Sequence, residues 1–152
     1  MSLLLVQHGK NNPKRLDPEK GLSPEGSKDV ERSAGVLRAH GVPVSTIWHS
    51  GKKRARQTAD IMAGYLGRDI AVKEREGLAP LDDVTKLDPD PDKNIMLVGH
   101  LPFMERLVSS LLTDSPDHPP LVKFQNGGVV ALDRDEKSGS WYIKWTLFPE
   151  IY

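Results

Sequence analysis

Two short and continuously apolar runs constrain the fold of this chain most strongly. Residues 3–6 and 95–98 are each long enough for one strand and carry apolar side chains at every position. An extended strand points successive side chains to opposite faces, so both faces of these strands must be covered. Such strands are typical of a parallel sheet that lies between two layers of helices.

The rest of the chain alternates between helical and extended patterns. A helix is expected to open at Ser23, a good N-cap, because Pro24 follows at the position where a missing N–H has no cost. In the last expected strand, Trp141, Ile143, Trp145 and Leu147 alternate with polar or exposed-type residues and predict one buried face. The other expected elements are helices at about 53–66 and after 102, strands at 45–49, 70–72 and 128–132, and a turn at 136–140.

We therefore predict an α/β fold, a three-layer α/β/α sandwich with a mostly parallel central sheet and an antiparallel edge. At 152 residues, the chain is expected to form a single domain over residues 1–152. No run approaches the roughly 20 apolar residues that a membrane-spanning helix needs, and no secretory signal is evident. With no cysteine, neither disulfides nor thiolate chemistry are available, and we expect a cytoplasmic protein.

Two histidines stand where a parallel sheet binds ligands. His8 and His100 each follow a predicted buried strand directly, and each lies beside a glycine, Gly9 or Gly99, that lets backbone approach a ligand. Because ligands of such sheets bind at the carboxyl ends of the strands, we expect the two histidines to meet at one site. A structural role as a hydrogen-bonded loop residue is the alternative for each histidine taken alone.

Four short segments of the sequence form an ordered set of motifs. They are Gln7-His8-Gly9, Lys20-Gly21-Leu22-Ser23-Pro24-Glu25-Gly26, Ser50-Gly51-Lys52-Lys53-Arg54-Ala55-Arg56-Gln57-Thr58 and Gly99-His100-Leu101-Pro102. In this order they resemble the motifs of the histidine phosphatase superfamily, the phosphoglycerate mutase-like proteins, and within it the small SixA-type phosphohistidine phosphatases. At the first segment the family has Arg-His-Gly.

The resemblance implies a phosphatase that carries the phosphoryl group on a histidine, without a cofactor or a metal ion. By this resemblance His8 is the nucleophile, and Arg54 and His100 are the other catalytic groups that surround the phosphoryl oxygens. The remaining substrate-binding candidates are Gln7, Gly9, Lys10 and Leu101. The implied partner is a phosphohistidine-bearing signalling or phosphotransfer protein, or else a small phosphorylated substrate.

Gln7 departs from the family pattern, because it brings neither the charge nor the two-pronged hydrogen bonding of arginine. Lys10 or Lys20 could supply a replacement charge, and a solvated surface position is the alternative for both. Two further functions stay open: a small-molecule phosphomonoesterase, and a pseudophosphatase that binds phosphate or a phosphoprotein without turnover. The phosphomonoesterase hypothesis needs a general acid, and the unresolved candidates are Glu74, Glu76, Asp82 and Asp83.

Nucleic-acid and metal chemistry fit the sequence less well. The chain has 21 basic and 21 acidic residues and no formal net charge, so a general nucleic-acid binder is not expected. The basic run at residues 52–56 lies inside the phosphatase-like segment instead. No His-x-x-x-His or Asp-x-His spacing is present, so no metal site is expected.

Overall fold

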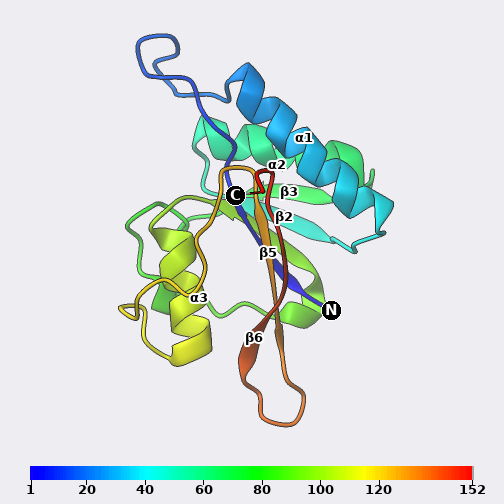
Figure 1. The fold of residues 1–152 in the computed structure, drawn as a ribbon, viewed down its shortest axis with the longest axis vertical. Coiled ribbons are helices and arrows are strands. Elements are labelled where there is room, and N and C mark those ends of the chain that lie inside the picture. Colours follow the sequence, from blue (N-terminus) through cyan, green and yellow to red (C-terminus); the bar gives the residue numbers. More distant parts are fainter. Residues whose placement is uncertain (152) are drawn as a thin grey trace.

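The computed structural model describes residues 1–151 and contains a six-stranded mixed sheet covered by helices on both faces (Figure 1). The first four strands are mutually parallel, β5 is antiparallel to β1, and β6 is antiparallel to β5. The mostly parallel sheet with an antiparallel edge is therefore confirmed. Across the sheet the strands are β3 (Ala71–Glu74), β2 (Thr46–His49), β4 (Ile95–Gly99), β1 (Leu3–Gln7), β5 (Val129–Arg134) and β6 (Trp141–Leu147).

Helices α1 (Pro24–Ala39) and α2 (Lys53–Leu66) cover one face of the sheet, and α3 (Phe103–Thr113) covers the other (Figure 1). Two short 3₁₀ turns, Val84–Lys86 and Pro91–Lys93, precede β4. β1 shows why both layers are needed, because its five residues are all buried. Leu4 and Val6 belong to the core on the α1 and α2 side, and Leu3 and Leu5 to the core on the α3 side.

The order of connections reverses between β1 and β4. The chain leaves β1 through α1 toward β2, and it leaves β4 through α3 on the opposite face. The carboxyl ends of these two neighbouring strands lie side by side, because Gln7 pairs with Gly99 in the parallel ladder. Such a topological switch point is where open α/β sheets bind ligands.

The start of α1 is fixed as the sequence predicts. The Ser23 hydroxyl accepts a hydrogen bond from the Gly26 N–H at 3.0 Å, and Pro24 occupies the first helical position. A Cβ at Gly26 would collide with the carbonyl oxygen of Lys10, so only glycine allows the helix to approach the segment after β1 this closely. The first turn of α1 thus packs directly on the chain that follows His8.

The single buried face predicted for β6 needs correction. Its apolar residues are half-buried rather than buried. Trp141 and Ile143 pack against the α3-side core, whereas Trp145 and Leu147 pack against the opposite core. The reason is a shift of register between Ala131 and Leu132 of β5, which lets one run of alternating residues change sides on this edge strand.

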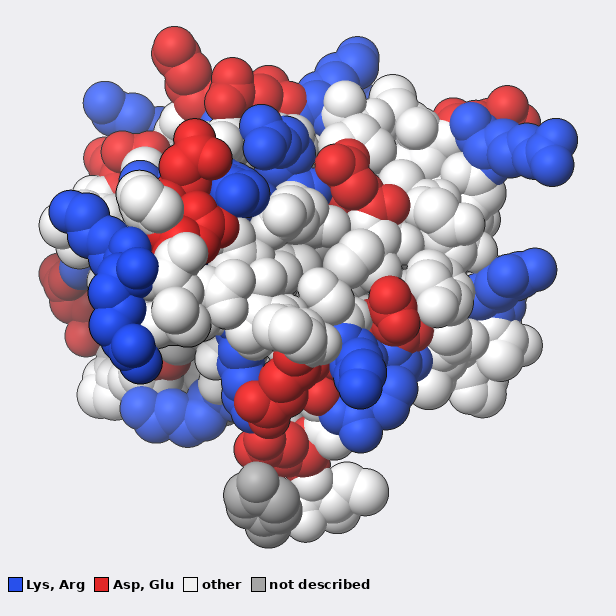
Figure 2. Space-filling model, turned by 90° about the horizontal axis from the view of Figure 1, so that it is seen from above, with Lys and Arg blue, Asp and Glu red and all other residues white. Residues whose placement is uncertain are grey.

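Charges of both signs are interspersed on the face seen in Figure 2, and neither sign forms a broad patch there. Within the described residues, none of the helices combines the length and the apolar character that a membrane crossing requires.

Candidate active site

His8 and His100 meet at the carboxyl ends of β1 and β4. Their ring centroids are 5.0 Å apart and their planes are inclined by 50°. Both side chains are buried, with 8% of His8 and 1% of His100 exposed. The backbone N–H of His8 donates to the carbonyl of Gly99 at 3.0 Å, which ties the two histidine segments together.

The contacts of His8 favour one tautomer of its ring. Nδ1 lies 2.7 Å from the carbonyl oxygen of Gly9, which can only accept, so Nδ1 carries the proton. The opposite nitrogen, Nε2, then holds a free lone pair, toward which Nε of Arg54 donates at 3.4 Å. A ring with this tautomer is prepared to act as a nucleophile through Nε2.

The backbone around His8 is held from two further elements. The carbonyl of His8 accepts a hydrogen bond from Nδ2 of Asn126 at 3.0 Å, and the N–H of Gly9 donates to the Thr58 hydroxyl at 3.0 Å. Thr58 in turn donates to the carbonyl of Arg54 at 2.8 Å. These bonds connect the nucleophile to the loop before β5 and to the first turns of α2.

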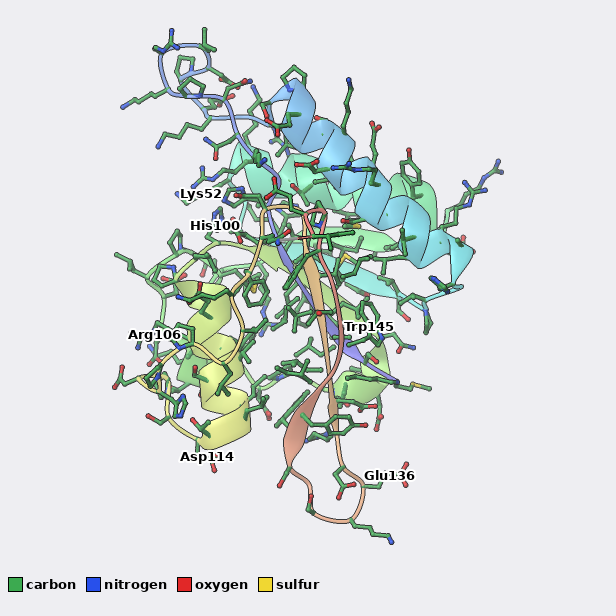
Figure 3. All side chains as sticks on the ribbon, viewed as in Figure 1. Lys52, His100, Arg106, Asp114, Glu136 and Trp145 are labelled. Carbon is green, nitrogen blue, oxygen red and sulfur yellow. The ribbon has the colours of Figure 1, made fainter. Side chains whose placement is uncertain are left out.

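Both site histidines are neutral at neutral pH. Burial is the main cause that lowers the pKa of His8 to about 4; the Arg54 charge also lowers it, against the raising effect of the Gly9 hydrogen bond. Burial likewise lowers the pKa of His100 to about 3, with further contributions from His8, Arg54 and Lys52. Lys52 and His100 lie near each other at the same end of the sheet in Figure 3. His8 therefore keeps its lone pair throughout the physiological pH range.

Arg54 is the cation that faces His8. It lies in the first turn of α2, whose start has no side-chain cap, and no ion pair to it is found within residues 1–151. The neighbouring Lys53 is different, because Asp17 binds its ammonium at 3.0 Å and Glu19 lies 3.7 Å from it. An unpaired guanidinium beside the start of a helix suits a phosphoryl group, which offers several anionic oxygens.

Gln7 ends β1 directly before the nucleophile and is 8% exposed. Its Oε1 is buried and has no hydrogen-bond partner among the described residues. Leu101 packs against the α3-side core, directly after His100. The structure thus brings together Gln7, His8, Gly9, Arg54, His100 and Leu101 at one edge of the sheet.

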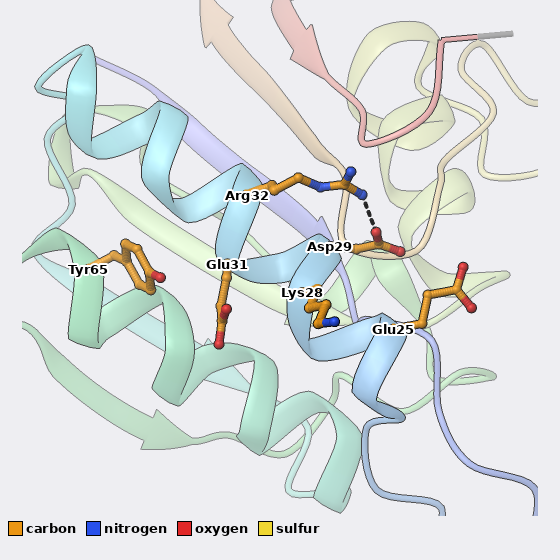
Figure 4. Close-up of a pocket in the computed structure, with 6 residues that line it drawn as sticks. All are labelled: Glu25, Lys28, Asp29, Glu31, Arg32 and Tyr65. Atoms are coloured by element: carbon orange, nitrogen blue, oxygen red, sulfur yellow. Dashed lines mark hydrogen bonds and ion pairs between the residues drawn. The ribbon is translucent and has the colours of Figure 1, made fainter.

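The ammonium of Lys10 is held by carboxylates. It lies 2.9 Å from Glu25, 3.1 Å from Glu150 and 3.9 Å from Asp29. Asp29 also forms an ion pair with Arg32 on the same helix. Both residues line a surface cavity between α1 and α2 (Figure 4). Lys10 thus connects α1 to the C-terminal segment, and its charge is balanced there by acidic groups.

The four candidate acids separate into two groups. The carboxylate of Asp82 accepts from the Ala79 N–H at 2.8 Å, and that of Asp83 accepts from the N–H and hydroxyl of Thr85, so both stabilise local turns. Glu74 and Glu76 are exposed. Glu74 packs beside Gly51, because a Cβ there would collide with its carboxylate. Glu74 therefore contacts the predicted phosphatase-like segment at 50–58.

Sequence reasoning named Ser50 only as part of a motif and missed its contact with the site. The Ser50 hydroxyl lies 2.6 Å from Nε2 of His100. Asn126 was also missed, and the only signal that could have identified it is its place before the two glycines that lead into β5.

His49 is buried, and its Nδ1 accepts from the N–H of Gly51 at 3.1 Å. Among the described residues, no three His, Cys, Asp or Glu side chains are grouped to hold a metal ion.

Known proteins resemble this chain in sequence and in fold. Residues 3–85, more than half of the chain, match the family model of the histidine phosphatase superfamily (branch 1). No curated protein matches the chain significantly. Among solved structures, the protein histidine phosphatase SixA complexed with tungstate is similar, with a TM-score of 0.79 and 19% identity over 98% of this chain and 97% of that one.

Two ester phosphatases share the fold as well. A mycobacterial glucosyl-3-phosphoglycerate phosphatase has a TM-score of 0.75 and 16% identity, with 95% of this chain and 97% of that chain covered. A phosphoserine phosphatase from Entamoeba histolytica has a TM-score of 0.69 and 16% identity, with 95% of each chain covered. The fold is that of phosphoglycerate mutase-like proteins, as the family resemblance of the sequence implies.

Proposed function

Because the chain belongs to the histidine phosphatase superfamily, branch 1, we propose that it is a phosphatase in which His8 carries the phosphoryl group and phosphohistidine is the substrate. The observation that carries the proposal is the neutral His8 ring, with Nδ1 bound to the Gly9 carbonyl and Nε2 directed at an unpaired guanidinium. The substrate would be a signalling or phosphotransfer protein.

The reaction has two displacements at phosphorus. In the first, Nε2 of His8 forms a bond to phosphorus while the bond from phosphorus to the substrate imidazole breaks; that ring has taken up a proton from water beforehand and leaves as neutral imidazole. In the second, a water oxygen bonds to phosphorus and the bond to Nε2 breaks, which releases neutral His8 and a phosphate that keeps both protons of the water. The transferring phosphoryl group spreads negative charge over its oxygens, which Arg54, His100 and the Gln7 amide would bind.

The surroundings of the site favour an imidazole leaving group over an alkoxide. An alkoxide needs a general acid, whereas the P–N bond of a phosphohistidine is labile once its ring is protonated. Asp82 and Asp83 are engaged in local turns, and no carboxylate among the described residues hydrogen-bonds to His8 or His100. The overall similarity to the SixA structure supports the same substrate class.

The ester alternative rests on Glu74. Its carboxylate packs beside Gly51, next to the Ser50 that contacts His100, and proteins with ester substrates share the fold. A small-molecule phosphomonoesterase would need this carboxylate to reach the leaving oxygen. The binding-only alternative rests on Gln7, which leaves Arg54 as the guanidinium beside His8.

Phosphate release decides between these functions. The substrates are a phosphohistidine-bearing domain and a phosphoserine peptide, tested with EDTA on the wild type, His8→Ala and the control His40→Ala, whose histidine is exposed at the end of α1. We expect release from the phosphohistidine domain by the wild type and His40→Ala, and none by His8→Ala. A clear preference for the ester would refute phosphohistidine as the substrate. Phosphate binding without release would refute the proposal that the protein is an enzyme. The cytoplasmic location of the protein stays a prediction.

A further inference from the structure

His100 has one engaged and one unengaged ring nitrogen. Its Nε2 lies 2.6 Å from the Ser50 hydroxyl, and its Nδ1 is buried without a hydrogen-bond partner within residues 1–151. The side chain is only 1% exposed, so bulk solvent has little access to the ring. A buried and unsatisfied ring nitrogen is costly, and in a native structure it calls for an explanation such as a catalytic role.

The protonation of His100 leaves a choice between two tautomers. The ring is neutral because burial and the nearby His8, Arg54 and Lys52 disfavour its charged form, and a neutral imidazole has one donor nitrogen and one acceptor nitrogen. With the proton on Nε2, the ring would donate to Ser50 and present only a lone pair at Nδ1, which repels phosphoryl oxygens. With the proton on Nδ1, the same neutral ring donates a hydrogen bond from the unengaged position.

The contacts of Ser50 are compatible with the second tautomer. The N–H of Lys52 lies 3.4 Å from the Ser50 hydroxyl oxygen and can only donate to it. With an acceptor position of that oxygen used in this way, the hydroxyl proton is available for Nε2 of His100. We propose that Ser50 is a positioning residue that holds neutral His100 with its proton on Nδ1, so that Nδ1 donates to the phosphoryl group during transfer. This inference rests on the proposed phosphatase function for its chemical purpose.

The turn that carries Ser50 is fixed on both sides. Gly51 has a φ of +90°, which favours glycine, and its N–H donates to Nδ1 of His49 at 3.1 Å. The carboxylate of Glu74 fills the space beside Gly51. These contacts fix the turn from which the Ser50 hydroxyl reaches His100.

Nitrogen NMR of the histidine rings tests the inference directly, since two-bond proton–nitrogen correlations distinguish the two neutral tautomers. We compare the wild type, Ser50→Ala and Ser50→Thr at neutral pH, with and without inorganic phosphate. The wild type should show His100 protonated at Nδ1, Ser50→Ala should shift the proton wholly or partly to Nε2, and Ser50→Thr should restore the wild-type pattern. Since one hydrogen bond is at stake, Ser50→Ala should lower kcat roughly tenfold, and Ser50→Thr should recover most of it.

Two results would overturn the inference: a wild-type His100 protonated at Nε2, or a Ser50→Ala spectrum identical to that of the wild type. The test also separates this inference from the function on which it rests. If no substrate is hydrolysed but the tautomer shifts as expected, the phosphatase proposal fails while the role of Ser50 in setting His100 stands. If hydrolysis proceeds through His8 and the tautomer does not depend on Ser50, only the role of Ser50 is refuted.

Discussion

Replacement of Arg54 by glutamine removes the guanidinium that donates toward the nucleophile His8. Nε of Arg54 is 3.4 Å from Nε2 of His8, and no ion pair holds its charge elsewhere among the described residues. Loss of one such preorganised donor costs about 2.7–4 kcal/mol of transition-state stabilisation, which corresponds to a fall of roughly 10²–10³ in kcat. Because the Arg54 charge lowers the pKa of His8, the same change should also raise that pKa.

The matched control is Arg56→Gln, two residues along the same helix, where the side chain is exposed. Single-turnover phosphate release from a phosphohistidine domain measures the chemical step, and a thermal melt shows that both variants are folded. We expect Arg56→Gln to match the wild type. If Arg54→Gln lost no more activity than Arg56→Gln, the idea that Arg54 stabilises the transferring phosphoryl group would be refuted.

Three further predictions follow from single features of the site and its frame. The pH profile of kcat/KM should be flat across the neutral range as far as His8 is concerned and fall as pH drops through about 4, because protonated His8 has no lone pair; an acid limb near the ordinary histidine pKa of 6.5 would contradict this. Gln7→Arg should raise kcat by up to roughly 10²–10³ if the missing charge limits the rate, and an unchanged rate in stopped-flow phosphate assays would show that it does not. Gly26→Ala should lower the free energy of unfolding by about 1–3 kcal/mol in denaturant melts, because the added Cβ meets the Lys10 carbonyl. Gly64→Ala, in open space on α2, should raise it by about 0.5–1 kcal/mol. Similar effects at both positions would refute the packing argument.

The sequence was sufficient to predict the sheet and the meeting of the two histidines. Both follow from local signals, since the apolar runs before His8 and His100 have the length and pattern of buried strands and parallel strands end at the same edge. The place of Arg54 beside His8 agrees with what the resemblance implies.

Contacts between distant segments could not be predicted in this way. One partner of Lys10 is Glu150, 140 residues later in the chain, and nothing local indicates that the C-terminal segment returns to α1. The register shift at Ala131 likewise depends on how β5 and β6 pair, so the alternation in β6 alone predicted one buried face where the structure has two half-buried ones. The hydrogen bond between Ser50 and His100 joins the ends of β2 and β4, and only the strand order brings these ends together.

The central claim is that His8 carries the phosphoryl group, and trapping of the phosphorylated protein tests it most directly. The wild type and His8→Ala are mixed with a phosphohistidine-bearing domain, denatured under alkaline conditions that preserve phosphohistidine, and digested for peptide mass spectrometry. We predict one phosphoryl group on the wild-type peptide that contains His8, and none on His8→Ala. Phosphate release by the wild type with no label on His8, or equal release by His8→Ala, would contradict the account.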